Sequence, residues 1–255
     1  MSANTVIFSN KMIGKNINVE KNEKGWYKVL LGELNAYNHA GEFYVIDGFK
    51  ELLTETDTYL SVKNRLESGL LKGECTHPLR EGHSDQDWLT RNLVIHEGFA
   101  SHQFMSFELE TTDTQVMGDY TVKVWGWILP TANQHGISLK ADLDNPDVNV
   151  AFSIRCFSKI FNYKGRVARR ITKLITYDRI DIPGKKNAVK GGDIDTITRE
   201  SGLSEVILSG TTLDKVLANK SFFNTENAGL RDEIIDLRNS MSNKTNDSLF
   251  LTWGN

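Results

Sequence analysis

A histidine directly before a proline is the first residue of this sequence whose setting points to chemistry. His77 ends the stretch GECTH, which begins at Gly73, and Pro78 follows it. Because proline disfavours the α-helical region for the preceding residue, His77 is expected in an extended backbone. A general base needs an imidazole that is fixed in place and titrates near the working pH, so His77 leads the histidines as a candidate. His102, at the start of a predicted strand, is the next candidate.

A serine and an aspartate on two predicted strands are further candidates. In DVNVAFSIRCF (147–157) the alternation places Ser153 opposite the more apolar face, where a serine is either a small half-exposed residue or a nucleophile. In ITYDRIDI (175–182), Asp178 shares a strand face with apolar neighbours, so its carboxylate needs a partner. The simplest partner is one of three nearby arginines, Arg169, Arg170 and Arg179.

Metal binding is a competing use for some of the same side chains. Cys75, His77 and His83 could supply three ligands, with Cys156 as a fourth. Their spacing, Cys-x-His-x5-His, matches no established zinc motif, and the sequence has no Cys-x-x-Cys pair. It also lacks the phosphate-loop, dinucleotide-binding, His-Glu-x-x-His and Gly-x-Ser-x-Gly motifs. We therefore predict neither a metal nor another cofactor.

The elements that must position these residues are a helix and a series of strands. From Asp57 to Lys72 apolar residues recur at steps of three and four, which predicts a helix, and Gly73 follows where a C-terminal cap is expected. The stretch up to Pro78 then begins an extended element. Alternating patterns predict strands further along the chain, over residues 103–110, 118–129, 147–157 and 170–182. The middle of the chain is therefore predicted to be mostly β-structure.

Composition limits the class of protein and of partner. The 255 residues are 39% hydrophobic, enough for one core domain with a smaller addition. The formal net charge of −3 does not call for a nucleic acid or a membrane surface as partner. Two cysteines, no signal-peptide pattern and no apolar run near ~20 residues predict a protein of the reducing cytoplasm. After Pro183 the composition changes, so we predict a domain over 1–185 and a helical C-terminal extension over 186–255.

Three short motifs, in their order along the chain, resemble those of the prohead (maturation) proteases of tailed bacteriophages. Members of that family carry Gly-Glu-Leu-Asp/Asn-His-Pro, then a strand ending in Val-Ser-Ser-Arg-Gly, then an aspartate with a proline nearby. GECTHP (73–78) matches the first motif, and Cys75 and Thr76 depart from it.

The second and third motifs follow in the strands. AFSIRC (151–156) matches the second in its serine and arginine, while Ile154 and Cys156 replace a serine and a glycine. Asp178 and Pro183 fit the third motif. The resemblance covers about residues 70–185.

The resemblance implies a fold and a catalytic triad. The phage family is similar in fold to the herpesvirus assemblins, so the implied fold is α+β, a mostly antiparallel β-barrel surrounded by helices. Ser153 would be the nucleophile, His77 the general base, and Asp178 the residue that orients the imidazole. His102 or Glu97 remains an alternative for the third position.

The resemblance also gives roles to residues around the triad. Arg155 and Cys156 follow the nucleophile, and their backbone N–H groups are candidates for an oxyanion hole or for substrate binding. Family members commonly cut after glutamate, which requires a basic pocket, and Arg169 and Arg170 are candidates for it.

The substrates and partners implied are those of phage assembly. The chain would be a serine endopeptidase of the phage prohead, inside the host cytoplasm, that cleaves scaffold, capsid and other prohead proteins. Such enzymes are made as zymogens that cleave themselves, so residues 186–255 would be a propeptide or a scaffold-targeting tail, with Glu200 and Glu205 as candidate cut sites. A homo-oligomer is compatible with this reading. The alternative from another class is a non-enzymatic scaffold or capsid-associated protein with the same fold.

Overall fold

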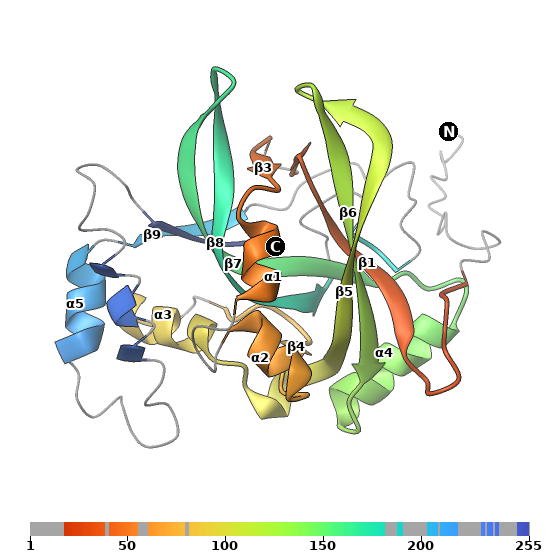
Figure 1. Cartoon of the computed structure of the whole chain (residues 1–255). Coiled ribbons are helices and arrows are strands. Elements are labelled where there is room, and N and C mark those ends of the chain that lie inside the picture. Colours follow the sequence, from red (N-terminus) through yellow and green to blue (C-terminus); the bar gives the residue numbers. More distant parts are fainter. Residues whose placement is uncertain are drawn as a thin grey trace, which may run out of the picture.

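Two β-sheets with helices packed on them form the described part of the chain (Figure 1). This computed structural model describes residues 18–38, 41–55, 61–79, 82–181, 188–190, 203–208, 210–218, 231–232, 234–236, 238–239 and 249–254. The predicted α+β class is confirmed. Within these residues neither sheet closes on itself, so the predicted barrel is not confirmed.

The first sheet has four antiparallel strands in the order β1-β6-β5-β4. Its members are β1 (Tyr27–Leu34), β4 (Lys72–Glu74), β5 (Ala100–Val116) and β6 (Asp119–Pro130). The alternation along β6 buries Val124 and Ile128 and leaves Trp125 and Trp127 outside, where their indoles donate hydrogen bonds to glutamates of β5. The strands predicted over 103–110 and 118–129 are confirmed. β5 is longer than the first prediction at both ends, and β6 is shifted by one residue from the second.

The second sheet has six strands in the order β2-β3-β8-β7-β10-β9. Its long members are β7 (Ala151–Tyr163) and β8 (Arg166–Ile180), which confirm the other two predicted strands, and the short ones are β2 (Ala36–Tyr37) and β3 (Phe43–Val45). β7 and β8 form a hairpin whose two turn residues, Lys164 and Gly165, both have positive φ, as a tight hairpin turn of the mirror-image type requires.

Six labelled helices connect and cover the sheets within the described part of the chain. They are α1 (Phe49–Thr54), α2 (Val62–Glu67), α3 (Asp85–Leu93), the 3-10 helix η1 (Glu97–Phe99), α4 (Gln134–Asp144) and α5 (Gly210–Ala218). The predicted helix over 57–72 is shorter than expected, and the residue with left-handed backbone after it is Gly69, not Gly73. α3 and α4 were not predicted, although Ser84 and Asn133 cap their N-termini through their side chains.

The C-terminal region is not only helical. Besides α5 it contributes β9 (Leu203–Leu208) and β10 (Leu249–Gly254), and β10 pairs with both β7 and β9. The region predicted as a helical extension therefore supplies two strands to the sheet that carries Ser153. Glu205 lies inside β9, opposite Thr252, whereas Glu200 falls outside the described residues.

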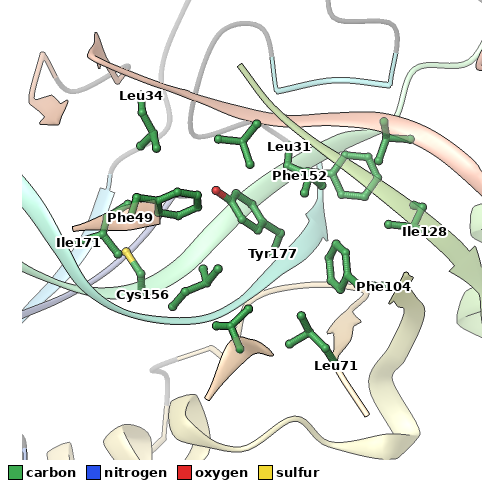
Figure 2. Packing of buried hydrophobic residues seen from close by; sticks show 14 of the residues in the cluster. Leu31, Leu34, Phe49, Leu71, Phe104, Ile128, Phe152, Cys156, Ile171 and Tyr177 are labelled. Atoms are coloured by element: carbon green, nitrogen blue, oxygen red, sulfur yellow. The ribbon is translucent and has the colours of Figure 1, made fainter. Parts of the chain in front are cut away.

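Apolar side chains are buried on both faces of the six-stranded sheet. One cluster, seen in Figure 2, lies between the two sheets and includes Phe152, Cys156 and Tyr177. A second cluster, with Trp88 of α3 and Phe157 of β7, covers the opposite face. The face of β7 that carries Ser153 is therefore buried too. None of the described helices is long and apolar enough to cross a membrane.

Candidate active site

His77 and Asp178 form a hydrogen-bonded pair in the interior. Nδ1 of His77 lies 2.7 Å from Oδ2 of Asp178, and both side chains are buried. Burial alone would raise the pKa of Asp178, but the positive charge of Arg155 and the bond to His77 outweigh it and hold this pKa at about 2. The carboxylate is therefore ionised at neutral pH, and Nδ1 carries the proton that it donates to Asp178.

The assignment of the proton to Nδ1 leaves Nε2 of His77 as the basic atom of the neutral ring. Nε2 is buried and has no hydrogen-bond partner. This is the arrangement that a general base needs, with one ring nitrogen fixed by a carboxylate and the other available for a proton.

Ser153 lies opposite Asp178 in the pairing of β7 with β8. Its side chain is buried, on the same face of β7 as Arg155. Because Nε2 of His77 accepts no hydrogen bond, the Ser153–His77 bond of a closed triad is not made in this arrangement. The structure thus brings the predicted base and the predicted aspartate into contact and places the predicted serine beside the aspartate in the sheet.

The chain reaches His77 through a close contact between the two sheets. β8 holds β4 with two side chains: Oγ1 of Thr176 donates to the carbonyl of Lys72 at 2.6 Å, and Oδ1 of Asp178 accepts the N–H of Glu74 at 2.8 Å. A Cβ at Gly73 would lie 2.2 Å from the carbonyl oxygen of Tyr177 and 2.4 Å from the ring of His102. Glycine is therefore required at the start of GECTHP by close approach and not as a helix cap.

Cys75 and Thr76 are the two departures from the family motif, and the structure requires little of the side chains at these positions. The N–H of Cys75 donates to the carbonyl of Phe99 at 2.9 Å, which any residue except proline would do. Thr76 is exposed. The first motif therefore tolerates changes at these two positions while Glu74 and His77 stay buried.

The side chain of Arg155 pairs with Asp178. Its Nε donates to Oδ2 and its Nη2 to Oδ1, each at 2.8 Å, and Nη1 lies 3.3 Å from the carbonyl oxygen of Asn92. The three arginines predicted as partners of Asp178 are engaged elsewhere, with three other carboxylates: Arg169 with Glu42, Arg170 with Asp47 and Arg179 with Asp142. That prediction was wrong, because the partner comes from the neighbouring strand and not from β8 itself.

Cys156 belongs to the core between the sheets (Figure 2). Burial raises the pKa of its thiol to about 12, so the thiol stays protonated at neutral pH. Its backbone is paired with Thr252 of β10, and that of Arg155 with Thr176 of β8. The oxyanion role predicted for these two residues therefore stays a prediction, carried by no contact described here.

The alternatives for the third position are placed differently from Asp178. Glu97 is largely exposed and forms an ion pair with Lys72 at 2.7 Å. His102 is fully buried with Nδ1 2.9 Å from Oγ of Ser101, and burial lowers its pKa to about 4 in spite of the nearby Asp178 charge. It is therefore neutral, and it packs on the ring of Phe152 at 5.7 Å.

The alternative of a metal site gains no support in the described part of the chain. No group of three or more potential ligands comes together there. His83 is exposed, while Cys156 lies in the core and His77 is bonded to Asp178.

The ion pairs that Glu74 forms with Arg91 and Arg155 beside the site were not predicted from the sequence. Glu74 is fully buried and accepts hydrogen bonds from Nη1 and Nη2 of Arg91 at 2.9 and 2.7 Å. Its own Oε2 lies 3.1 Å from Nη2 of Arg155. The signal available was the position of Glu74 between Gly73 and His77 in GECTHP, but Arg91 lies in a helix that was not predicted.

Comparison with known proteins gives the family. The model of the Peptidase S80 family matches residues 6–235, which is most of the chain, so the protein belongs to this peptidase family. The match confirms the predicted relation to the prohead serine proteases of phages. No curated protein and no solved structure matches significantly, and the similarity to herpesvirus assemblins stays a prediction.

Proposed function

We propose that this peptidase is a serine endopeptidase with Ser153 as nucleophile, His77 as general base and Asp178 as the orienting carboxylate. The observation that carries the proposal is the buried 2.7 Å contact between His77 and Asp178, formed beside Ser153 in the strand register. A buried carboxylate that fixes one nitrogen of a histidine, next to a serine, is typical of an activated hydroxyl.

The chemistry follows from these positions. Oγ of Ser153 attacks the carbonyl carbon of the peptide bond while Nε2 of His77 takes its proton. The imidazolium so formed is stabilised by ionised Asp178 and returns the proton to the leaving amine as the C–N bond breaks. Water then attacks the acyl-serine ester by the same route and releases the acid and the free serine. Ser153 or His77 must first move so that the hydrogen bond between them can form.

The proposed substrates are the scaffold, capsid and other proteins of a phage prohead in the host cytoplasm, with cleavage after glutamate and activation by self-cleavage. Membership of the Peptidase S80 family supports this setting. Arg169 and Arg170 contribute no pocket for glutamate in this proposal, because both guanidinium groups are paired with acidic residues. A homo-oligomer within the prohead is part of the same proposal.

The direct test is covalent labelling with a fluorophosphonate, which reacts with activated serines. Wild-type protein is expected to be labelled and to trim itself or a scaffold substrate, and Ser153→Ala and His77→Ala are expected to do neither. Ser158→Ala is the matched control, since Ser158 is another buried serine of β7. Labelling that persists in folded Ser153→Ala would rule the proposal out.

A non-enzymatic prohead protein with the same fold is the second candidate. The observation in its favour is that Nε2 of His77 has no hydrogen bond with Ser153. A folded wild-type chain that is neither labelled nor able to cleave scaffold protein would select this candidate.

A further inference from the structure

The carboxylate of Asp178 is held from four sides. His77 and Nε of Arg155 share Oδ2, while Nη2 of Arg155 and the N–H of Glu74 share Oδ1, all at 2.7 to 2.8 Å. A carboxylate offers about four lone-pair directions, so this one is saturated. Its orientation toward His77 is therefore set by Arg155 and by the end of β4.

Arg155 is fixed in turn by a second carboxylate. Oε2 of Glu74 lies 3.1 Å from Nη2 of Arg155, and Glu74 is also clamped by both terminal nitrogens of Arg91 and by the N–H of His96 at 2.5 Å. Arg91 is the only one of these four charged side chains that reaches the solvent, with 23% of its side chain exposed. A chain of alternating charges thus runs from the surface of α3 through Glu74 and Arg155 to Asp178.

The charges in this chain balance. Glu74 and Asp178 supply two negative charges, and Arg91 and Arg155 two positive ones, so the cluster is neutral while His77 is neutral. Among the described residues, the other titratable or charged groups near it include His96, Cys75, Arg179, the neutral His102 and the buried Arg65, whose positive charge acts on Arg155. When His77 takes a proton, the charge of Glu74 helps to stabilise it and that of Arg91 opposes it.

We propose that Glu74, Arg155 and Arg91 are positioning residues of the catalytic site, which aim Asp178 at His77 and set the charge against which His77 is protonated. The inference rests on the proposed function, in which His77 is the base. Glu74 of GECTHP and Arg155 of AFSIRC would thus act together to orient Asp178. A salt-bridge cluster that only stabilises the fold and does not act on His77 would leave the titration of His77 unchanged in folded variants.

The pH profile of kcat/KM provides the first test. Glu74→Gln keeps the shape of the side chain and removes its negative charge, so the acidic limb should move to lower pH by about one unit. Arg91→Met removes a positive charge at the exposed end, so the same limb should move to higher pH, by about half a unit because solvent screens this site. Opposite shifts from two neighbours are not expected from general damage to the fold.

Arg155→Lys separates orientation from charge. Lysine keeps the positive charge but cannot make two parallel hydrogen bonds to one carboxylate. We expect kcat to fall about 100-fold, with KM and the pH profile close to wild type. Glu42→Gln, which breaks the comparable pair with Arg169 at the other end of β8, is the control and should leave kcat and the profile unchanged.

A readout without catalysis keeps this inference apart from the proposed function. In Ser153→Ala protein, the ring signals of His77 can be titrated by NMR with and without Glu74→Gln and Arg91→Met. The same opposite shifts are expected there, whether or not the chain cleaves any substrate. Folded variants whose profile and His77 titration coincide with wild type would overturn the inference, while absent labelling of wild type would overturn only the proposed function.

Discussion

Nδ1 of His77 lies 2.7 Å from Oδ2 of Asp178, although the strands that position the two residues belong to different sheets. His77 follows β4 of the four-stranded sheet, and Asp178 lies in β8 of the six-stranded one. The pair therefore exists only while β4 stays docked on β8, through Asp178 itself and through Thr176. Assembly of the site and packing of the sheets are one event.

Asp178→Asn should impair both turnover and stability. The neutral amide no longer holds His77 in the required tautomer, so kcat should fall by about 10³- to 10⁴-fold. Arg155 would lose its main counter-charge in the interior, which should cost about 3 kcal/mol in the free energy of unfolding. Peptide cleavage and urea denaturation measure the two effects. Asp181→Asn, at an exposed aspartate just after β8, should change neither; a folded Asp178→Asn enzyme with wild-type turnover would exclude Asp178 from the triad.

Gly73→Ala should destabilise the protein although it adds only one methyl group. The new Cβ would lie within 2.4 Å of the Tyr177 carbonyl and the His102 ring, and the carbonyl cannot move without disturbing β8. We expect a loss of about 2 kcal/mol or more in the free energy of unfolding, measured by urea denaturation. Gly32→Ala is the matched control, because its nearest contact would be an ordinary 3.8 Å. Equal stabilities of the two variants would contradict the close approach at Gly73.

Acid should weaken the fold in a pH range set by His102. Burial lowers the pKa of His102 to about 4, below its value in the unfolded chain, so the unfolded state binds the proton first as the pH falls. Between about pH 6.5 and pH 4 the free energy of unfolding should therefore drop by about 3 kcal/mol. Below that, protonation of Asp178, whose pKa is about 2, continues the loss.

Urea denaturation at several pH values tests this dependence. In His102→Asn the decline between pH 6.5 and pH 4 should be much smaller, while the decline below pH 4 should remain. A variant that follows the wild-type curve throughout would show that another group is responsible.

The two cysteines should react at very different rates with a thiol reagent. Cys75 is only partly buried, whereas Cys156 is fully buried with a pKa raised to about 12. Burial raises the pKa of Cys75 as well, so its labelling should be slow but complete, at one thiol per native chain. Urea should release the second thiol. Two rapidly reacting thiols in the native protein would contradict the core position of Cys156, and Cys75→Ser should abolish the native reaction.

The strands were predictable because their patterns have the simple period of a sheet. Residues 118–129 and 170–182 alternate clearly, and β6 and β8 lie there. α4 was missed because its apolar periodicity is weak, and α3 because its first residues belong to the polar, turn-prone stretch EGHSDQD (81–87). The tail was predicted to be helical, although it contains β9 and β10. β10 pairs with β9 and with β7, and strand pairing between distant segments is hard to recognise from the local sequence.

The site could be predicted only as far as the motifs named it. His77 and Asp178 were chosen from a proline, a strand pattern and a family resemblance, and they do meet. The arginine expected to neutralise the charge of Asp178 was predicted on the same strand or just before it, because only proximity in the sequence indicated a partner. Arg155 lies 23 residues away and reaches Asp178 across the hairpin, a relation that depends on the register of β7 with β8.

The position of β10 between β7 and β9 has a practical consequence for any nicked form of the protein. A single cut in the chain between Ala218 and Leu249 leaves the last strand hydrogen-bonded to two neighbours, so the two pieces should separate in denaturing electrophoresis yet migrate together under native conditions. Release of the tail would then be governed by the rate at which the sheet opens and not by the rate at which the backbone is cut.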